Sequence, residues 1–125
     1  AAGGGAIINF SSISYMMGNA GYPAYTAANG AITALTRSLA RELGPEGVRV
    51  NALAPGGIET PKVMGVSGRG GEKPMDIPEG PLAMDALGHP KDVAGCVLFL
   101  ASDEARFLNG LTIPVDNGLY ARPHH

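Results

Sequence analysis

The chain has 125 residues, of which 45% are hydrophobic and 16% charged, and its formal net charge is -2. This length suits one domain, and this balance is typical of a folded α/β protein rather than a disordered chain. The weak negative charge argues against broad attraction to nucleic acid or an anionic membrane, and no apolar run approaches the roughly 18 residues of a membrane span. A single cysteine, Cys96, excludes an internal disulfide and favours a cytoplasmic location.

The first predicted elements are a strand and a long helix. Residues 6–10 are a short apolar run after a glycine cluster, which predicts a buried strand. Residues 11–21 are too polar and too rich in glycine to form a helix interior. A helix is predicted at 24–43, because Pro23 suits a first helical turn and glycine and proline follow residue 43. Its apolar face is predicted from Ala28, Ile32, Leu35 and Leu39, and its outer side from Arg37, Arg41 and Glu42.

The second half of the chain predicts two more strands, one helix and one long loop. The continuous apolar run at 48–53 indicates a strand covered on both faces, as in a parallel sheet. Residues 61–88 are rich in Gly, Pro and Met, and a loop of that length is either a functional lid or disordered. We interpret it as a substrate loop. A helix begins at Pro90, and a strand follows at 111–115, with Pro114 placing part of it at a sheet edge. The apolar face of this helix is predicted from Val93, Ala94, Val97, Leu98 and Leu100.

This order of elements predicts a doubly wound α/β fold with a small parallel sheet of about three strands, formed by residues 1–125 as a single domain. No phosphate loop of the G-x-G-x-x-G kind occurs, because the glycine cluster at 3–5 precedes a strand instead of following one. No metal site is predicted, since His124 and His125 have no further ligands near them in sequence.

A serine and a tyrosine indicate a proton-transfer site. Ser12 lies thirteen residues before Tyr25, which stands near the start of the Ala-rich helix. One helical turn later, where such a site needs a cation, the chain has the neutral Asn29. Around these residues the chain resembles the short-chain dehydrogenases/reductases, specifically their C-terminal half. The resemblance rests on segments in the same order at 7–12, 23–28, 48–56, 97–102 and 115–118.

The resemblance implies a partial Rossmann-like fold without its N-terminal cofactor-binding half. It also implies an NAD(P)-dependent oxidoreductase acting on a small alcohol or carbonyl compound. Tyr25 matches the general acid/base of the family, and Ser12 matches the hydroxyl that orients the carbonyl. Such chemistry needs both, because hydride transfer to a carbonyl requires a proton and a second hydrogen bond to the developing charge. The choice between NAD and NADP is made in the missing half. The residues that match the stretch along the nicotinamide and its pyrophosphate are Pro55, Gly56, Ile58 and Thr60.

In the family, the position of Asn29 is a lysine, which lowers the pKa of the tyrosine and holds the nicotinamide ribose. A tyrosine without such help titrates near 10, so only about one in a thousand is ionised at pH 7. Asn29 carries no charge. We therefore predict an impaired enzyme, in which alcohol oxidation, which needs the phenolate, suffers more than carbonyl reduction.

Three functions remain open at this stage. The first is a truncated oxidoreductase of the family. The second is a non-catalytic assembly module that keeps the scaffold. The third is a cofactor-free hydrolase or dehydratase, which would have to work with a hydroxyl pair that lacks a strong base. An open apolar edge at strand 6–10, together with helix 24–43, predicts a homo-oligomer, either a dimer or a tetramer.

Overall fold

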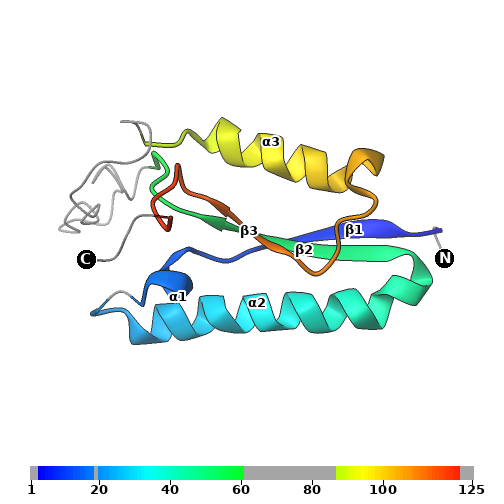
Figure 1. Ribbon diagram of the computed structural model, residues 1–125, viewed down its shortest axis with the longest axis horizontal. Helices are drawn as coiled ribbons and strands as arrows, with labels where there is room; N and C mark the ends of the chain where they lie inside the picture. Colours follow the sequence, from blue (N-terminus) through cyan, green and yellow to red (C-terminus); the bar gives the residue numbers. More distant parts are fainter. Residues whose placement is uncertain (1–2, 19, 61–86, 122–125) are drawn as a thin grey trace.

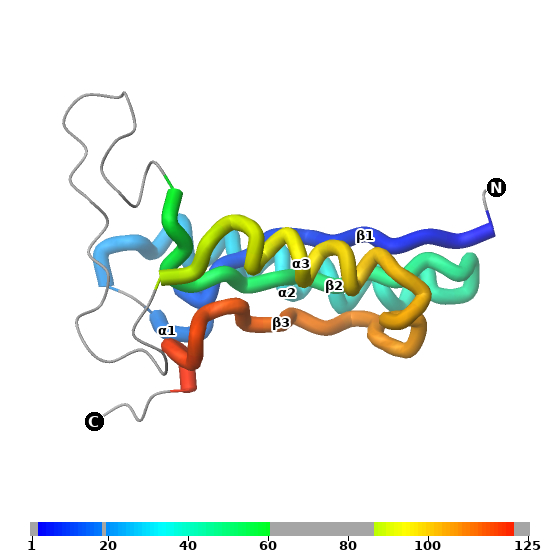
Figure 2. Tube along the Cα trace, turned by 90° about the horizontal axis from the view of Figure 1, so that it is seen from above, coloured from blue at the N-terminus to red at the C-terminus, as the bar shows by residue number. Residues whose placement is uncertain are grey.

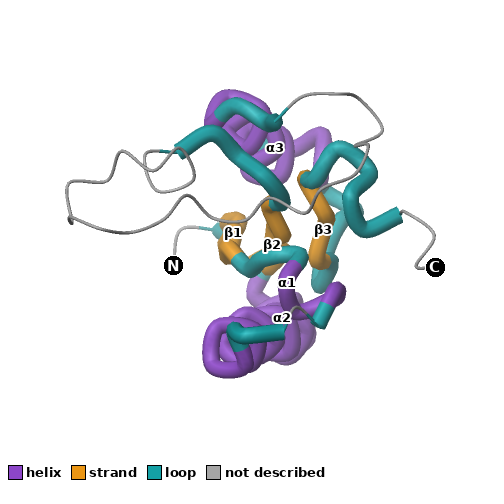
Figure 3. The backbone as a smooth tube through the Cα atoms, turned by 90° about the vertical axis from the view of Figure 1, so that its left-hand side faces the viewer, coloured by secondary structure: helices purple, strands orange, loops and turns teal. Residues whose placement is uncertain are grey.

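The computed structural model describes residues 3–18, 20–60 and 87–121. Within these ranges three strands form one parallel sheet between two layers of helix (Figures 1 and 3). The strands, in their order across the sheet, are β1 (Gly5–Phe10), β2 (Val48–Pro55) and β3 (Thr112–Val115). Helix α2 (Pro23–Leu43) covers one face, and α3 (Pro90–Ala101) covers the other. This arrangement confirms the predicted α/β class with a three-stranded parallel sheet.

The central strand β2 carries the most deeply buried residues of the sheet. It pairs with β1 on one side and β3 on the other, so that Leu53 stands between Phe10 and Ile113 (Figure 2). Val50 and Leu53 are fully buried, as expected for a strand with helices over both faces. The apolar run at 48–53 therefore predicted the position of this strand correctly, although the strand extends to Pro55.

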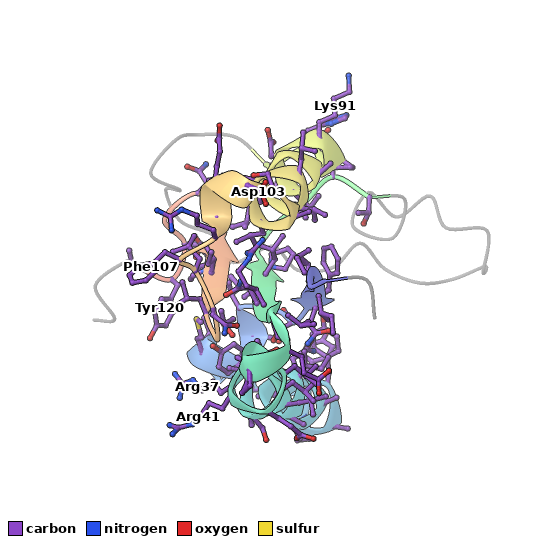
Figure 4. All side chains as sticks on the ribbon, turned by 90° about the vertical axis from the view of Figure 1, so that its right-hand side faces the viewer. Arg37, Arg41, Lys91, Asp103, Phe107 and Tyr120 are labelled. Carbon is purple, nitrogen blue, oxygen red and sulfur yellow. The ribbon has the colours of Figure 1, made fainter. Side chains whose placement is uncertain are left out.

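Helix α2 turns a face toward the sheet that differs from the predicted one. Leu35 is 51% exposed and Ala28 is also exposed. The buried side instead consists of Asn29, Thr33, Thr36 and Ala40. The prediction was wrong for Ala28 and Leu35, whereas Ile32 and Leu39 are partly buried. It counted only hydrocarbon, and the polar side chains of the buried side hydrogen-bond there. The outer position of Arg37 and Arg41 is confirmed, and Figure 4 shows both side chains projecting from the helix.

The hydrogen bonds between α2 and β1 form a row that we call the polar seam, consisting of Asn9, Ser11, Asn29, Thr33 and Thr36. The Asn9 amide Nδ2 donates to Thr36 Oγ1 at 3.0 Å, and Thr36 is fully buried. Nearer the start of the helix, Ser11 Oγ donates to the backbone carbonyl of Asn29 at 2.9 Å. The buried polar groups of the seam are thus paired with one another or with the backbone, as burial of such groups requires.

Helix α3 packs on the opposite face through hydrocarbon. Leu100, Leu53 and Ala105 form the buried centre of this contact. The predicted face of α3 is correct for Val93, Val97 and Leu100, and wrong for Ala94 and Leu98. Leu98 is 74% exposed, because it lies on the outer side of the helix. The partly buried residues around the centre are Ile8, Val93, Cys96, Val97, Leu108, Ile113 and Val115.

The start of α3 is capped by a histidine. His89 Nδ1 accepts a hydrogen bond from the Lys91 backbone amide at 3.1 Å, and the His89 amide donates to Asp92 Oδ2 at 2.7 Å. These two bonds satisfy amide groups that the first turn of a helix leaves without partners.

A four-residue helix, α1 (Ser14–Met17), follows β1. The expectation that no helix forms within 11–21 was wrong for these residues. A single turn requires no apolar stripe; here the Met16 amide donates to the Ile13 carbonyl at 2.9 Å, and Gly18 ends the turn in the left-handed conformation.

The two sheet edges differ in their backbone groups. Along β1 the amides of Gly5 and Ser11 donate to carbonyls of β2 and the residue before it. The even-numbered residues of β1 therefore have their amide groups on the side that faces away from β2. Along β3 the carbonyls of Leu111 and Val115 accept from β2, so Thr112 and Pro114 face away from it. Pro114 carries no amide hydrogen. Its predicted place at a sheet edge is confirmed.

Most of the predicted substrate loop, 61–88, lies outside the described residues. Its two ends are held side by side, because the Glu59 amide donates to the Gly88 carbonyl at 2.8 Å and the Gly88 amide donates to the Gly57 carbonyl at 2.9 Å. In the parts of the chain that the structure describes, no helix has both the length and the apolar character needed to cross a membrane.

Candidate active site

The predicted site residues gather at the carboxyl ends of the strands. Ser12 follows β1, and residues 56–60 follow β2. Tyr25 is in the first turn of α2, whose N-terminus lies at the same end of the sheet (Figure 1). This end is where ligands bind in open α/β sheets.

Ser12 lies in a loop that is fixed by the end of β2. The Ser11 amide donates to the Leu53 carbonyl at 2.8 Å, and the Ile13 amide donates to the Pro55 carbonyl at 3.3 Å. Ser12 itself is only 9% exposed, and its Oγ accepts a hydrogen bond from the Ser14 amide at 3.2 Å. Among the described residues nothing accepts the hydroxyl hydrogen of Ser12. The oxygen is therefore oriented by the backbone.

Tyr25 offers the second hydroxyl from a more accessible position. Its side chain is 49% exposed, and the helix turn that carries it is closed by the hydrogen bond from the Thr26 amide to the Tyr22 carbonyl at 2.9 Å. A phenol at a helix start with half of its surface accessible can meet a substrate without prior movement of the backbone.

Asn29 is directed into its own helix. It is 7% exposed, and its Nδ2 donates to the Tyr25 carbonyl at 2.9 Å. Its own carbonyl accepts from Ser11 Oγ at 2.9 Å and from Thr33 Oγ1 at 3.3 Å. The side chain at the position of the family's lysine is thus committed to a backbone bond within α2.

The predicted cofactor segment lies beside the Ser12 loop. The Ile13–Pro55 hydrogen bond joins the two directly. Ile58 forms an isolated parallel bridge with Gly88, and Thr60 is half-buried. The structure thus places the Ser12 loop against both α2 and the end of β2.

Gly56 is required by a contact within the chain. A Cβ at this position would lie 2.7 Å from Asp116 Cβ and 2.9 Å from Asp116 Cα, distances that real side chains essentially never show. The glycine is therefore required by the turn that follows β3.

That turn, at residues 116–120, is a part of the site that sequence reasoning did not include. The Asp116 carboxylate accepts from the Gly118 amide at 3.1 Å and from the Tyr120 amide at 2.8 Å. Asn117 adopts a φ of 53°, which asparagine tolerates better than most residues. Leu119 then packs with Ile13 and Ala54 beneath the Ser12 loop. The Asp-Asn-Gly sequence is a turn signal that could have identified this segment.

Comparison with known proteins agrees with this architecture. The family model described as enoyl-(acyl carrier protein) reductase matches residues 1–120. The short-chain reductase protein NovJ of Streptomyces niveus is 45% identical over 119 residues, which cover 93% of this chain and 45% of NovJ. The 3-oxoacyl-[acyl-carrier-protein] reductase FabG of Pseudomonas aeruginosa is 40% identical over 123 residues, covering 93% of this chain and 45% of FabG.

A solved structure shares the fold. That of 4-hydroxyisoleucine dehydrogenase complexed with NADH superposes with a TM-score of 0.76 at 32% identity, over 94% of this chain and 47% of the other. The chain belongs to the short-chain dehydrogenase/reductase family, in the group whose model is described as enoyl-(acyl carrier protein) reductase. It spans about half the length of the curated relatives that it matches.

Proposed function

We propose that this chain supplies the proton-transfer part of an NAD(P)-dependent oxidoreductase that interconverts a carbonyl compound and an alcohol. Ser12 donates a hydrogen bond to the substrate oxygen, and Tyr25 exchanges a proton with it. The observation that carries the proposal is the state of the Ser12 hydroxyl, which is buried, accepts from the Ser14 amide and has no acceptor for its hydrogen among the described residues. A preoriented donor of this kind stabilises charge that develops on an oxygen.

The described residues fit the nicotinamide end of such a cofactor. A hydroxyl donor and a half-exposed phenol stand at the carboxyl end of the sheet, with Pro55 joined to the loop that holds Ser12. The cofactor, when bound, supplies or accepts the hydride. We assign residues 55–60 to its nicotinamide side. The sequence has no G-x-G-x-x-G loop, so we expect these 125 residues by themselves to bind the nucleotide weakly.

Two kinds of relative favour a ketone one methylene away from a thioester carbonyl as the substrate. FabG is named as a reductase of 3-oxoacyl groups on acyl carrier protein. Acetoacetyl-CoA contains the same 3-oxo thioester and serves as the probe. We assign residues 61–88 to the substrate loop, since its ends meet beside the β2 end of the site.

The asparagine favours one direction of this reaction. Reduction needs a phenol that donates a proton, whereas oxidation needs a phenol that has already lost one. Asn29 gives no cation to help that loss, and its amide is occupied by the Tyr25 carbonyl. We therefore propose that the protein works as a reductase, and that Asn29→Lys raises the rate of alcohol oxidation more than that of carbonyl reduction. Equal gains in both directions, or none in either, would contradict this assignment.

The test combines intact mass, cofactor binding and turnover on one purified sample. NADH or NADPH fluorescence should change on titration, and acetoacetyl-CoA should be reduced. Tyr25→Phe should lower kcat by about 100-fold or more. Tyr22→Phe is the matched control, because Tyr22 is similarly exposed three residues earlier. Cofactor binding without any loss of turnover in Tyr25→Phe would overturn the assignment of the phenol.

A second candidate function is assembly, and the outer side of α2 favours it. Leu35 is half-exposed on a helix whose buried side is polar. We propose a dimer or tetramer that uses this surface of α2, whether or not the protein is also an enzyme. A monomer by light scattering at micromolar concentration would contradict it.

The remaining assignments are less specific. A cofactor-free hydrolase is not supported, because His89, the one histidine in the described ranges, already caps α3. We assign the protein to the cytoplasm, where an unpaired thiol such as Cys96 stays reduced.

A further inference from the structure

The segment that holds Ser12 is tied to the helix that carries Tyr25 by one side chain, Ser11. Ser11 Oγ donates to the Asn29 carbonyl at 2.9 Å and lies 3.4 Å from Thr33 Oγ1. Among the described residues, every hydrogen bond between residues 11–14 and α2 comes from this hydroxyl. Ser11 is 9% exposed, so water offers it little alternative.

Ser11 is also rigidly attached on its other side. Its amide donates to the Leu53 carbonyl at 2.8 Å, which continues the β1–β2 ladder by one residue. The following residue is Ser12. The backbone on which Ser12 stands is therefore fixed to the central strand, and its neighbour's side chain is fixed to α2.

Asn29 completes the path to the tyrosine. Its carbonyl accepts from Ser11, and its Nδ2 donates to the Tyr25 carbonyl at 2.9 Å. Hydrogen bonds thus lead from Ser11, the residue before Ser12, through Asn29 to the Tyr25 backbone. We propose that Ser11 is a positioning residue, whose bond to Asn29 sets the place of the first turns of α2 relative to Ser12. This inference rests on the proposed function, in which both hydroxyls act on one substrate oxygen.

A hydrogen bond suits this task better than a hydrocarbon contact. Two hydroxyls that act on the same oxygen must both come within about 3 Å of it. A hydrogen bond depends strongly on the distance and angle between its atoms, whereas apolar attraction is non-directional. A displacement of about 1 Å between catalytic groups can lower a rate about 100-fold.

Thr36 provides a matched control. It belongs to the same polar seam and is also buried, and its Oγ1 accepts from Asn9 Nδ2 at 3.0 Å. It lies seven residues beyond Asn29, which is about 10 Å along the helix axis. A purely structural role for seam hydroxyls predicts the same consequences at Ser11 and at Thr36. A positioning role predicts a catalytic effect at Ser11 alone.

The first measurement compares kcat and KM in the full chain with acetoacetyl-CoA as the probe. We expect Ser11→Ala to lower kcat about 10- to 100-fold while KM for the nicotinamide cofactor changes less than about twofold. Thr36→Val should leave kcat within about twofold. Ser11→Thr, which keeps the hydroxyl, should recover most of the lost rate. Similar losses of kcat in Ser11→Ala and Thr36→Val would overturn the inference.

The second measurement needs no turnover. Amide hydrogen exchange in the turns around Asn29 should become about tenfold faster in Ser11→Ala, while Thr36→Val should affect later turns. An inactive wild-type protein would refute the proposed function. Amide hydrogen exchange would still test whether the Ser11–Asn29 hydrogen bond holds the first turns of α2. Unchanged amide exchange around Asn29 in Ser11→Ala would refute the positioning role of Ser11 even in an active enzyme. If Ser11→Ala does not fold, Ser11→Cys, with a weaker donor of similar size, takes its place in both measurements.

Discussion

The two faces of the sheet are covered by helices that are held in different ways. On one side α3 contacts β2 through a hydrocarbon cluster centred on Leu100 and Leu53. On the other side, where α2 also packs on β2, hydroxyls and amides link the helix to β1 and to the residue that follows it, with Asn9 bound to Thr36 and Ser11 bound to Asn29. The two helices flank the same three strands, so the difference lies in their side chains.

This difference shows how stability and position can be supplied separately. Apolar burial is non-directional and stabilises in proportion to the area removed from water, so α3 contributes most through contact. On folding, a hydrogen bond to water is replaced by one within the protein, so each bond contributes little net free energy. Its strict geometry, however, fixes the distance between the two groups. The helix with directional bonds is the one that carries Tyr25. We expect the largest losses of stability from mutations on the α3 side, and a change of catalytic geometry from mutations at the Ser11 end of the polar seam.

The largest expected effect on stability comes from a variant that leaves a cavity on the α3 side. Leu100 is 1% exposed, and Leu100→Ala should lower the free energy of unfolding by about 2–5 kcal/mol. Urea unfolding followed by circular dichroism measures it. Leu98→Ala on the same helix is the control, because Leu98 is largely exposed and should cost less than about 0.5 kcal/mol. Equal losses from the two variants would mean that α3 is not held by this cluster.

A smaller effect is expected from the polar seam, and it should depend on whether one or both partners change. Thr36→Val leaves the Asn9 amide without its acceptor and should cost about 1–3 kcal/mol. Replacing Asn9 by Leu as well removes the stranded group, so the double variant should regain part of that loss. A double-mutant cycle of unfolding free energies measures the coupling. Additive losses would indicate that the bond contributes nothing specific.

The N-cap of α3 should contribute less to the free energy of unfolding than the Asn9–Thr36 hydrogen bond. His89→Ala removes the acceptor of the Lys91 amide and should lower stability by about 1 kcal/mol. His89→Asn keeps a short acceptor at the N-cap, so it should lower stability by only a few tenths of the loss expected for His89→Ala. Thermal melts of the two variants provide the comparison, and identical melting temperatures would show that the cap is not needed to start this helix.

The smallest expected effect on the fold is at Leu35. Leu35→Gln lies on the outer side of α2 and should change the stability of the isolated protomer by less than about 0.5 kcal/mol. If α2 forms the interface, the same change should shift the oligomer toward smaller species in light scattering at micromolar concentration. A marked loss of protomer stability without any change in mass would place Leu35 in the fold and not in an interface.

The sequence predicted the sheet well because each strand has a local signal. The apolar run at 48–53 and the proline at 114 predicted a central strand and an edge, and both predictions are confirmed. The buried face of α2 was mispredicted, since periodicity was counted only for apolar residues. Asn29, Thr33 and Thr36 recur at the same helical spacing. A search for small polar residues at that spacing could have found them.

The candidate site was predictable only in part. Ser12, Tyr25 and Asn29 follow from their spacing and from the family resemblance. The role of Ser11 depends on a partner eighteen residues away, and nothing local separates Ser11 from the serine beside it. The need for Gly56 likewise depends on a turn sixty residues later. Such contacts are set by tertiary packing, which no local pattern contains.

Pro114 has a consequence for how a further strand could pair with this sheet. A strand added beside β3 would take its hydrogen bonds from the residues that face away from β2, and Pro114 has no amide hydrogen to give. The proline thus interrupts any hydrogen-bond ladder that would extend the sheet past β3.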